Sequence, residues 1–358
     1  MITGIAPDIE RILEAGNQAP SGENCQPWHF VVRDENTIEI YLLPERDQSA
    51  YGWGRRASYL ACGAVIENMI ITASAEGYRA DVEYFPLANP EHVATITLAK
   101  SVVVDALAPF IGKRVTNRKP YRKDPLTRAQ SDALAEAAAT TGYGTLALAE
   151  DADDVARLGR VGSTNEEIML ANRSLHRFFF NHVNWTKEED ERNKIGFFIK
   201  TLELPPPAQA LFRILRRWPV MRMFNMIGFN EIVAKQNAAV NVAASAMGTL
   251  MIDGVEPIDF VKIGRSVERL WLTATSLGLS LQPLTGVLFF KLRIIDGGEK
   301  NVFSPRERAR ILESYRVAES IFAAEGRHIA FMFRIGHGDA PSARAVRFPL
   351  TNAVTVVL

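Results

Sequence analysis

Ala19-Pro-Ser-Gly-Glu-Asn-Cys-Gln-Pro-Trp28 is the most distinctive stretch of the sequence. The segment before it, residues 8–19, has apolar residues at helical spacing, so we expect a helix that ends where this stretch begins. Ser21, Asn24 and Gln26 carry hydroxyl and amide groups, which can satisfy both donors and acceptors at the edge of a heteroaromatic ring. An ordinary capped turn is the alternative interpretation of these residue types.

A second polar stretch, Arg114-Val-Thr-Asn-Arg118, lies about a hundred residues later. Two arginines that flank a hydroxyl can hold a phosphate through charge-assisted hydrogen bonds, because guanidinium groups suit bidentate contact. A solvated basic turn before a helix is the alternative, and the neighbouring residues Lys119, Arg122 and Lys123 are consistent with it.

Two later segments could contribute to the same kind of site. Gly278-Leu-Ser-Leu-Gln-Pro-Leu-Thr-Gly286 follows an expected helix, and a glycine at its end permits close approach of the backbone to a ligand. The chain then finishes with an expected strand, residues 328–335, followed by Arg344 and Arg347. Taken alone, both segments are also compatible with ordinary loops.

The sequence indicates an internal repeat of long period. The expected helix at residues 260–278 can be laid over the expected helix at residues 58–77, and both end at glycine. The overlay pairs Gly264 with Gly63 and Glu268 with Glu67. Glycine in the middle of a helix costs about 1 kcal/mol relative to alanine, so a matched pair indicates close packing rather than chance similarity of two amphipathic helices.

Composition narrows the class of protein. The chain has 358 residues, of which 47% are hydrophobic and 23% charged, which is typical of a globular protein with two domains. Lysine plus arginine and aspartate plus glutamate are balanced at 41 each, so no overall field favours nucleic acid. The two cysteines form neither a disulfide framework nor a metal-binding spacing. We find no signal peptide and no apolar run long enough to span a membrane, so we expect a cytoplasmic protein.

The remaining pattern predicts alternating strands and helices. Strands are expected at residues 29–33, 37–43, 80–85, 93–98, 248–252 and 328–335, and further helices after residue 127 and at residues 305–325. We predict an N-terminal half at residues 1–110 and a C-terminal half at residues 111–358. The second half contains an aromatic-rich insertion, residues 176–230, that the first half lacks.

These motifs resemble those of a known family. The Ala19–Trp28 stretch resembles the APSxxNxQPW signature of the nitroreductase superfamily of FMN-dependent oxidoreductases, and Arg114–Arg118 resembles its RxSxR motif. Apart from the insertion, the whole chain is similar to single-chain FMN-binding oxidoreductases of the Acg type. The resemblance implies an α+β fold duplicated in one chain, with mixed, mostly antiparallel sheets packed with helices. It also implies FMN-binding residues: Pro20, Ser21, Asn24, Gln26, Arg114, Thr116, Arg118, Thr285, Gly286, Arg344 and Arg347.

The resemblance implies particular roles for some of these residues. Arg114 is expected at the FMN phosphate, Thr116 at the phosphate or ribityl chain, and Arg118 at the ribityl and pyrimidine side. Gly286, with Thr285, is expected against the flavin, with a backbone N–H directed at N5. At the C-terminus, Arg347 is our first choice for a further phosphate contact, and Arg344 is the second.

Each half carries only part of the motif set, so we expect one pseudodimer within one chain, with one FMN and no need of a second copy. The expected function is electron transfer from NADH or NADPH through FMN to a small planar acceptor such as a quinone or nitroaromatic compound. We assign no side-chain nucleophile, no general base and no metal. The alternative is a non-catalytic FMN store or sensor, in which the insertion forms a lid.

Contact with a membrane is a further alternative. Residues 211–229 contain basic and apolar but no acidic residues, a composition compatible with an interfacial helix. We do not expect this contact, because Pro219 interrupts the segment and a lid over an apolar pocket would need the same residues.

Overall fold

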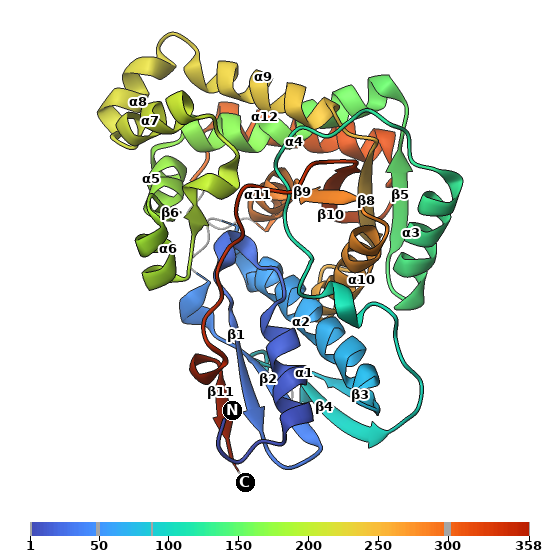
Figure 1. Ribbon diagram of the computed structural model, residues 1–358. Helices are drawn as coiled ribbons and strands as arrows, with labels where there is room; N and C mark the ends of the chain where they lie inside the picture. The colour runs from blue at the N-terminus through green and yellow to red at the C-terminus, as the bar shows by residue number, and fades with distance from the viewer. Residues whose placement is uncertain (1, 48–50, 87–88, 297–301, 358) are drawn as a thin grey trace.

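The computed structural model describes residues 2–47, 51–86, 89–296 and 302–357 (Figure 1). A five-stranded sheet has the order β11-β1-β2-β4-β3, and a four-stranded sheet has the order β5-β8-β10-β9. All neighbouring strands in these two sheets are antiparallel except β1 and β11. The predicted α+β class with mostly antiparallel sheets is confirmed.

The first sheet is built almost entirely from the N-terminal part of the chain. Its strands are β1 (Trp28–Val32), β2 (Thr37–Leu42), β3 (Tyr78–Tyr84), β4 (His92–Lys100) and β11 (Val354–Val356). In β1 and β2 every second side chain is buried, which is the alternation that predicted them. The short β11 was not predicted, and it brings the end of the chain alongside β1 in parallel.

The second sheet consists of β5 (Thr145–Ala149), β8 (Ala246–Ile252), β9 (Ser280–Pro283) and β10 (His328–Gly336). Helices around the two sheets are α1 (Pro7–Asn17), α2 (Arg56–Ala75), α3 (Arg128–Thr140), α4 (Ala152–Ala171), α10 (Pro257–Ser276), α11 (Gly286–Ile295) and α12 (Pro305–Ile321). Sequence signals at helix starts are used: Thr127 and Ser304 each form a capping box, and Asp151 caps α4. Short 3-10 turns lie at Gly22–Asn24, Pro44–Arg46, Trp53–Arg55, Ala108–Phe110, Ile199–Leu202 and Leu350–Asn352.

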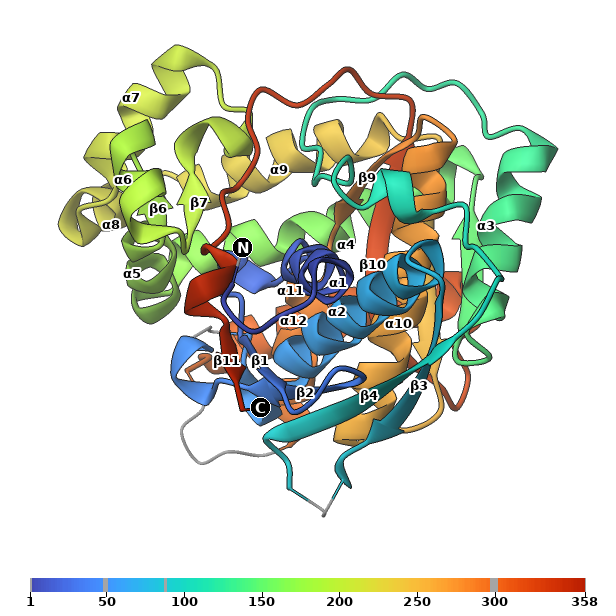
Figure 2. The same ribbon diagram turned by 60° about the horizontal axis from the view of Figure 1, so that its bottom comes forward.

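The two helices of the expected repeat, α2 and α10, pack against each other at the centre of the molecule (Figures 1 and 2). A Cβ atom on Gly63 would lie 2.0 Å from the carbonyl oxygen of Val261, and one on Gly264 would lie 2.1 Å from that of Leu60. The matched glycines are therefore the crossing point of the helices. This confirms the close packing predicted from their position in mid-helix.

The insertion is mainly helical and occupies one corner of the molecule (Figure 1, upper left). It comprises α5 (Arg173–Asn181), β6 (Val183–Asn184), α6 (Lys187–Asn193), β7 (Phe197–Phe198), α7 (Pro206–Leu215) and α8 (Trp218–Asn225), and it leads into α9 (Phe229–Val242). Pro219 lies in the first turn of α8, where the missing N–H costs nothing. The predicted interruption at Pro219 is confirmed, because residues 211–229 do not form one continuous helix: α7 ends at Leu215 and α8 begins again at Trp218.

One segment, Trp53–Ala75, is long and apolar enough to cross a membrane by length and composition alone. The sequence-based statement that no run reaches this length was therefore too strict. Within the most apolar window of this segment, 72% is buried inside the molecule, mostly as α2 in contact with α1 and α10. This burial accounts for its apolar composition.

Candidate functional site

Two adjoining cavities are lined by residues from the N-terminal and the C-terminal parts of the sequence. They have volumes of about 270 and about 320 Å³, and both are bordered by Pro20, Ser21, Thr116, Arg118 and Phe197. Because they share this wall, they form one elongated site. We call the first the aromatic compartment and the second the arginine compartment, after the side chains described below.

The Ala19–Trp28 loop has an unusual backbone. Glu23, Asn24 and Gln26 have φ angles of 44°, 55° and 49°, in the left-handed region that costs other residues than glycine about 1–3 kcal/mol. The side chains of Asn24 and Gln26 hold this conformation. Asn24 Nδ2 donates to the carbonyl oxygens of Lys194 and Val346, each at 2.8 Å. The loop is thereby joined to the insertion and to the C-terminal segment.

Gln26 is fully buried and lines neither compartment. Its Nε2 donates to the carbonyl oxygen of Lys194 at 2.7 Å, and its Oε1 accepts from the backbone N–H of Phe348 at 2.7 Å. The expectation that Gln26 contacts a ligand does not agree with this position. The side chain braces the loop because the left-handed backbone turns it toward the protein interior.

The arginine compartment is strongly cationic. Arg114, Arg344 and Arg347 line it, and Arg118 borders it. Arg114 is 4% exposed, and its Nε lies 2.9 Å from Oε1 of Glu268, a fully buried carboxylate on α10. Three guanidinium groups thus line this compartment, and one of them, Arg114, is paired with a buried carboxylate.

Burial makes this excess charge costly. It lowers the pKa of Arg347 to about 9, with a further contribution from the nearby Arg114. Burial also raises the pKa of Glu268, although Arg114 opposes the shift. Within the described part of the chain, the buried Nε of Arg347 has no hydrogen-bond partner. A bound anion with several acceptor oxygens would supply both the missing charge and the missing acceptor.

The arginines are also fixed in place by the backbone. Arg347 donates to the carbonyl oxygen of Ala19 at 3.0 Å, and Arg114 donates to that of Gln18 at 2.7 Å. Arg344 donates to the carbonyl oxygen of Arg114 at 2.8 Å. These contacts connect the first motif, the second motif and the C-terminal segment around one compartment.

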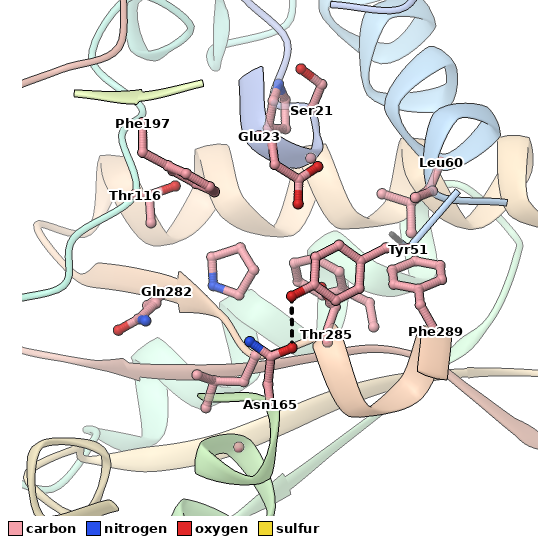
Figure 3. Close-up of a pocket in the computed structure, with 18 of the residues that line it drawn as sticks. Ser21, Glu23, Tyr51, Leu60, Thr116, Asn165, Phe197, Gln282, Thr285 and Phe289 are labelled. Atoms are coloured by element: carbon pink, nitrogen blue, oxygen red, sulfur yellow. Dashed lines mark hydrogen bonds between the residues drawn. The ribbon is translucent and has the colours of Figure 1, made fainter. Parts of the chain in front are cut away.

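The aromatic compartment has flat apolar walls. Its lining includes Tyr51, Phe178, Phe179, Phe197, Trp271, Phe289 and Phe331. Polar groups enter it from Ser21, Glu23, Thr116, Arg118, Asn165, Glu166, Gln282 and Thr285 (Figure 3). Such a space suits a planar molecule with a polar edge.

Thr285 and Gly286 lie at the start of α11, beside this compartment. A Cβ atom on Gly286 would lie 2.1 Å from Oδ1 of Asn165, so the close approach at this glycine is made by a side chain of α4. Asn165 Oδ1 also accepts a hydrogen bond from the Tyr51 hydroxyl at 2.7 Å (Figure 3). The glycine was expected to admit a ligand, and the structure shows that it admits Asn165.

Arg118 and Glu166 are charged groups in the same compartment. Burial raises the pKa of Glu166, while the positive charge of Arg118 opposes this shift. Burial likewise lowers the pKa of Arg118, whose Nη1 donates to the carbonyl oxygen of Thr201 at 3.1 Å. The compartment therefore contains a carboxyl group that holds its proton to higher pH than a surface glutamate does.

The structure brings together all the predicted site residues except Gln26. Pro20, Ser21, Thr116 and Arg118 border both compartments, Thr285 and Gly286 line the aromatic compartment, and Asn24, Arg114, Arg344 and Arg347 line the arginine compartment. The insertion contributes Phe178, Phe179, Phe197 and Leu202 to one wall. Among the described residues, no group of His, Cys, Asp or Glu is arranged to hold a metal ion.

Comparison with known proteins gives sequence relatives. No protein-family model matches the chain. An uncharacterized protein of Mycobacterium tuberculosis, MT1398, is 26% identical over 341 residues, which cover 94% of this chain and 46% of that protein. The protein named "Putative NAD(P)H nitroreductase acg" of the same organism is 32% identical over 122 residues, or 33% of this chain and 37% of that protein. Over these 122 residues the chain is similar in sequence to that putative nitroreductase. It spans less than half the length of either protein.

Solved structures that align with this chain include two nitroreductases. The FMN-dependent nitroreductase NfnB from Mycobacterium smegmatis, in complex with NADPH, has 13% identity and a TM-score of 0.36 over 68% of this chain and 94% of its own. A nitroreductase with bound FMN from Desulfitobacterium hafniense has 14% identity and a TM-score of 0.38, over 71% of this chain and 98% of its own. TM-scores this low do not establish a shared fold, so the relationship rests on sequence.

Sequence reasoning missed several residues of the site. Tyr51, Asn165 and Glu166 line the aromatic compartment but belong to no recognisable motif. Asn165 and Glu166 lie in α4, where polar residues at these positions look like an ordinary half-exposed helix face. Glu23 was quoted only as a variable position of the first motif, yet it points into the same space (Figure 3).

Proposed function

We propose that the protein is an FMN-dependent oxidoreductase that takes electrons from NADH or NADPH and passes them to a small planar acceptor, such as a quinone or a nitroaromatic compound. The observation that supports this proposal is that the cationic arginine compartment adjoins the aromatic compartment. FMN has the matching form, since a planar ring is joined through a ribityl chain to a phosphate. The two volumes together fall within the range of pockets for small ligands, about 300–1,000 Å³.

Three groups of residues would hold the cofactor. Arg114, Arg344 and Arg347 would bind the phosphate, and the unpartnered Nε of Arg347 provides a donor for it. Thr116 and Arg118, at the shared wall, would contact the ribityl chain. The aromatic compartment would hold the ring, with Thr285 and Gly286 at its side as the family resemblance implies.

Bound FMN would supply the electron-transfer chemistry, while the protein orients the ring and excludes water. Arg118 places a positive charge in the aromatic compartment, which would stabilise negative charge on a bound ring. The Glu166 carboxyl, with its raised pKa, would retain a proton near that ring. NADPH is the donor to test first, because the aligned NfnB structure was determined in complex with it.

We further infer one FMN per chain, in a duplicated fold with halves at residues 1–110 and 111–358. Support comes from the matched helices, whose paired glycines meet at the crossing. Glu268 is paired with Arg114, which lines the arginine compartment, whereas its counterpart Glu67 is paired at 2.8 Å with Arg265 and also contacts Arg269, both from α10. The position around Glu67, which would correspond to the phosphate site in the duplicated fold, is thus occupied by side chains of the protein itself.

The second candidate is an FMN store or sensor, because the aromatic side chains of the insertion wall the compartment. Both candidates assume a reducing cytoplasm, with which the free cysteines Cys25 and Cys62 are compatible.

Two measurements separate these proposals. The absorption spectrum of purified protein, with flavin quantification, should give about one FMN per chain. Two FMN molecules would contradict the single-site proposal, and none after reconstitution would contradict both functions. Anaerobic mixing with NADPH or NADH should then bleach the flavin, and an added quinone should restore its colour through many cycles. Bound flavin that neither nucleotide bleaches would favour storage.

A further inference from the structure

Helices α7 and α8 and the start of α9 lie at a corner of the molecule (Figures 1 and 2). This part of the chain exposes large apolar side chains. Ile214 and Met223 are 56% and 55% exposed, Met226 and Ile227 are 76% and 75% exposed, and Ile232 is 46% exposed. Met223 lies in the last turn of α8, and Met226 and Ile227 lie in the turn that directly follows it. Single exposed apolar residues are normal, but a group on consecutive helices indicates an interaction surface.

Arginines surround these apolar side chains. Arg213, Arg216, Arg217 and Arg222 are exposed on the same helices, and residues 204–230 contain no aspartate or glutamate. Arg216 also meets Arg173 and Arg177 of α5 at a third cavity of about 270 Å³, beside Trp218. The chain as a whole has no net charge, so this basic surface is a local feature.

The aromatic compartment does not account for these residues. The part of the insertion that lines the compartment is Phe178, Phe179, Phe197 and Leu202, none of which belongs to α7 or α8. Helices α7 and α8 use Leu215 and Met221 for packing, both completely buried. Their outward apolar side chains are thus separate from the wall of the flavin site proposed above.

We propose that this corner docks on an anionic lipid membrane. Met223, Met226 and Ile227 would enter the boundary between headgroups and acyl chains, while the arginines pair with lipid phosphates. The cavity formed by Arg173, Arg177 and Arg216 would receive one such phosphate. A second copy of the chain is a poorer occupant, because self-association would bring the same arginines against each other.

The test is co-sedimentation of the full chain with phosphatidylglycerol vesicles, in parallel with phosphatidylcholine vesicles. Wild-type protein should bind the anionic vesicles and lose binding as salt is raised. Arg216→Glu with Arg217→Glu should weaken binding roughly thirtyfold or more, at about fivefold for each cation removed. Met226→Asp with Ile227→Asp should weaken it at least about tenfold.

Matched controls lie elsewhere on the surface. Val102→Asp with Val103→Asp changes residues that are 95% and 74% exposed, and Arg128→Glu changes a side chain that is 95% exposed. These variants should bind vesicles as the wild type does. The fluorescence emission of Trp218 should shift to the blue on anionic vesicles in the wild type and the controls. It should not shift in the corner variants, which are Arg216→Glu with Arg217→Glu and Met226→Asp with Ile227→Asp.

Three results would overturn the proposal. The first is equal binding to anionic and neutral vesicles, or to neither. The second is unchanged binding by the corner variants. The third is self-association of the wild type in sedimentation velocity without any binding to vesicles, if the corner variants abolish that self-association.

Discussion

Removal of Arg114 should have two separable effects, one on stability and one on binding of the FMN phosphate. Arg114 is 4% exposed and pairs at 2.9 Å with the fully buried Glu268. Arg114→Ala would remove the ion-pair partner of that buried carboxylate, which costs up to about 3–5 kcal/mol. Loss of one charge-assisted contact to phosphate costs less, about 1.5–3 kcal/mol. In the single variant the larger effect would hide the smaller one.

The double variant Arg114→Ala with Glu268→Gln separates them. Without the buried charge, most of the lost stability should return in urea unfolding, while FMN should still bind roughly tenfold to a hundredfold more weakly. Riboflavin, which lacks the phosphate, should keep its affinity in the same fluorescence titration. Glu268→Gln alone should strengthen FMN binding, because it removes the carboxylate that is paired with Arg114. Equal losses for FMN and riboflavin in the double variant would refute the reasoning.

Three other predictions test different parts of the structure. As pH rises through about 9, Arg347 loses its charge, so the FMN-free protein should become more stable and its FMN affinity should fall. Urea unfolding and FMN titrations from pH 7 to 10 check both effects. Arg347→Met should abolish the pH dependence of stability and of FMN affinity. Gly264→Ala should destabilise the fold by about 1 kcal/mol in urea unfolding, since overpacking of about 1–3 kcal/mol outweighs the helix-propensity gain of about 1 kcal/mol. Gly112→Ala meets open space and is the control; a stabilised Gly264→Ala variant would contradict the close crossing. Phe197→Ala should speed FMN release in stopped-flow fluorescence, because this ring borders both compartments.

The regular elements could largely be predicted from the sequence. Periodic apolar residues and glycine stops located α2 and α10, and strict alternation located β1 and β2. The three residues of β11 could not be predicted, because so short a strand is defined by its partner β1 and not by its own pattern. The break near Pro219 was predicted, but the sequence did not show that this proline lies in the first turn of the next helix.

The candidate site residues that motifs carried lie close together in the structure. The arginines of the arginine compartment come from motifs and from the C-terminal segment, and the fold brings them together. Glu166 and Asn165 could not be found, because their role follows from the position of α4 relative to Tyr51 and Arg118. Gln26 was misassigned because an amide in a binding motif can face either a ligand or the loop that carries it.

The placement of both sides of the cavity on one chain affects how the site responds to dilution. A site shared between two subunits empties when the protein falls below the dissociation constant of the dimer. Here the Ala19–Trp28 loop and Arg114 remain tethered, so their assembly is intramolecular and independent of protein concentration. Cofactor retention in a dilute cell or assay would then depend on the free cofactor alone.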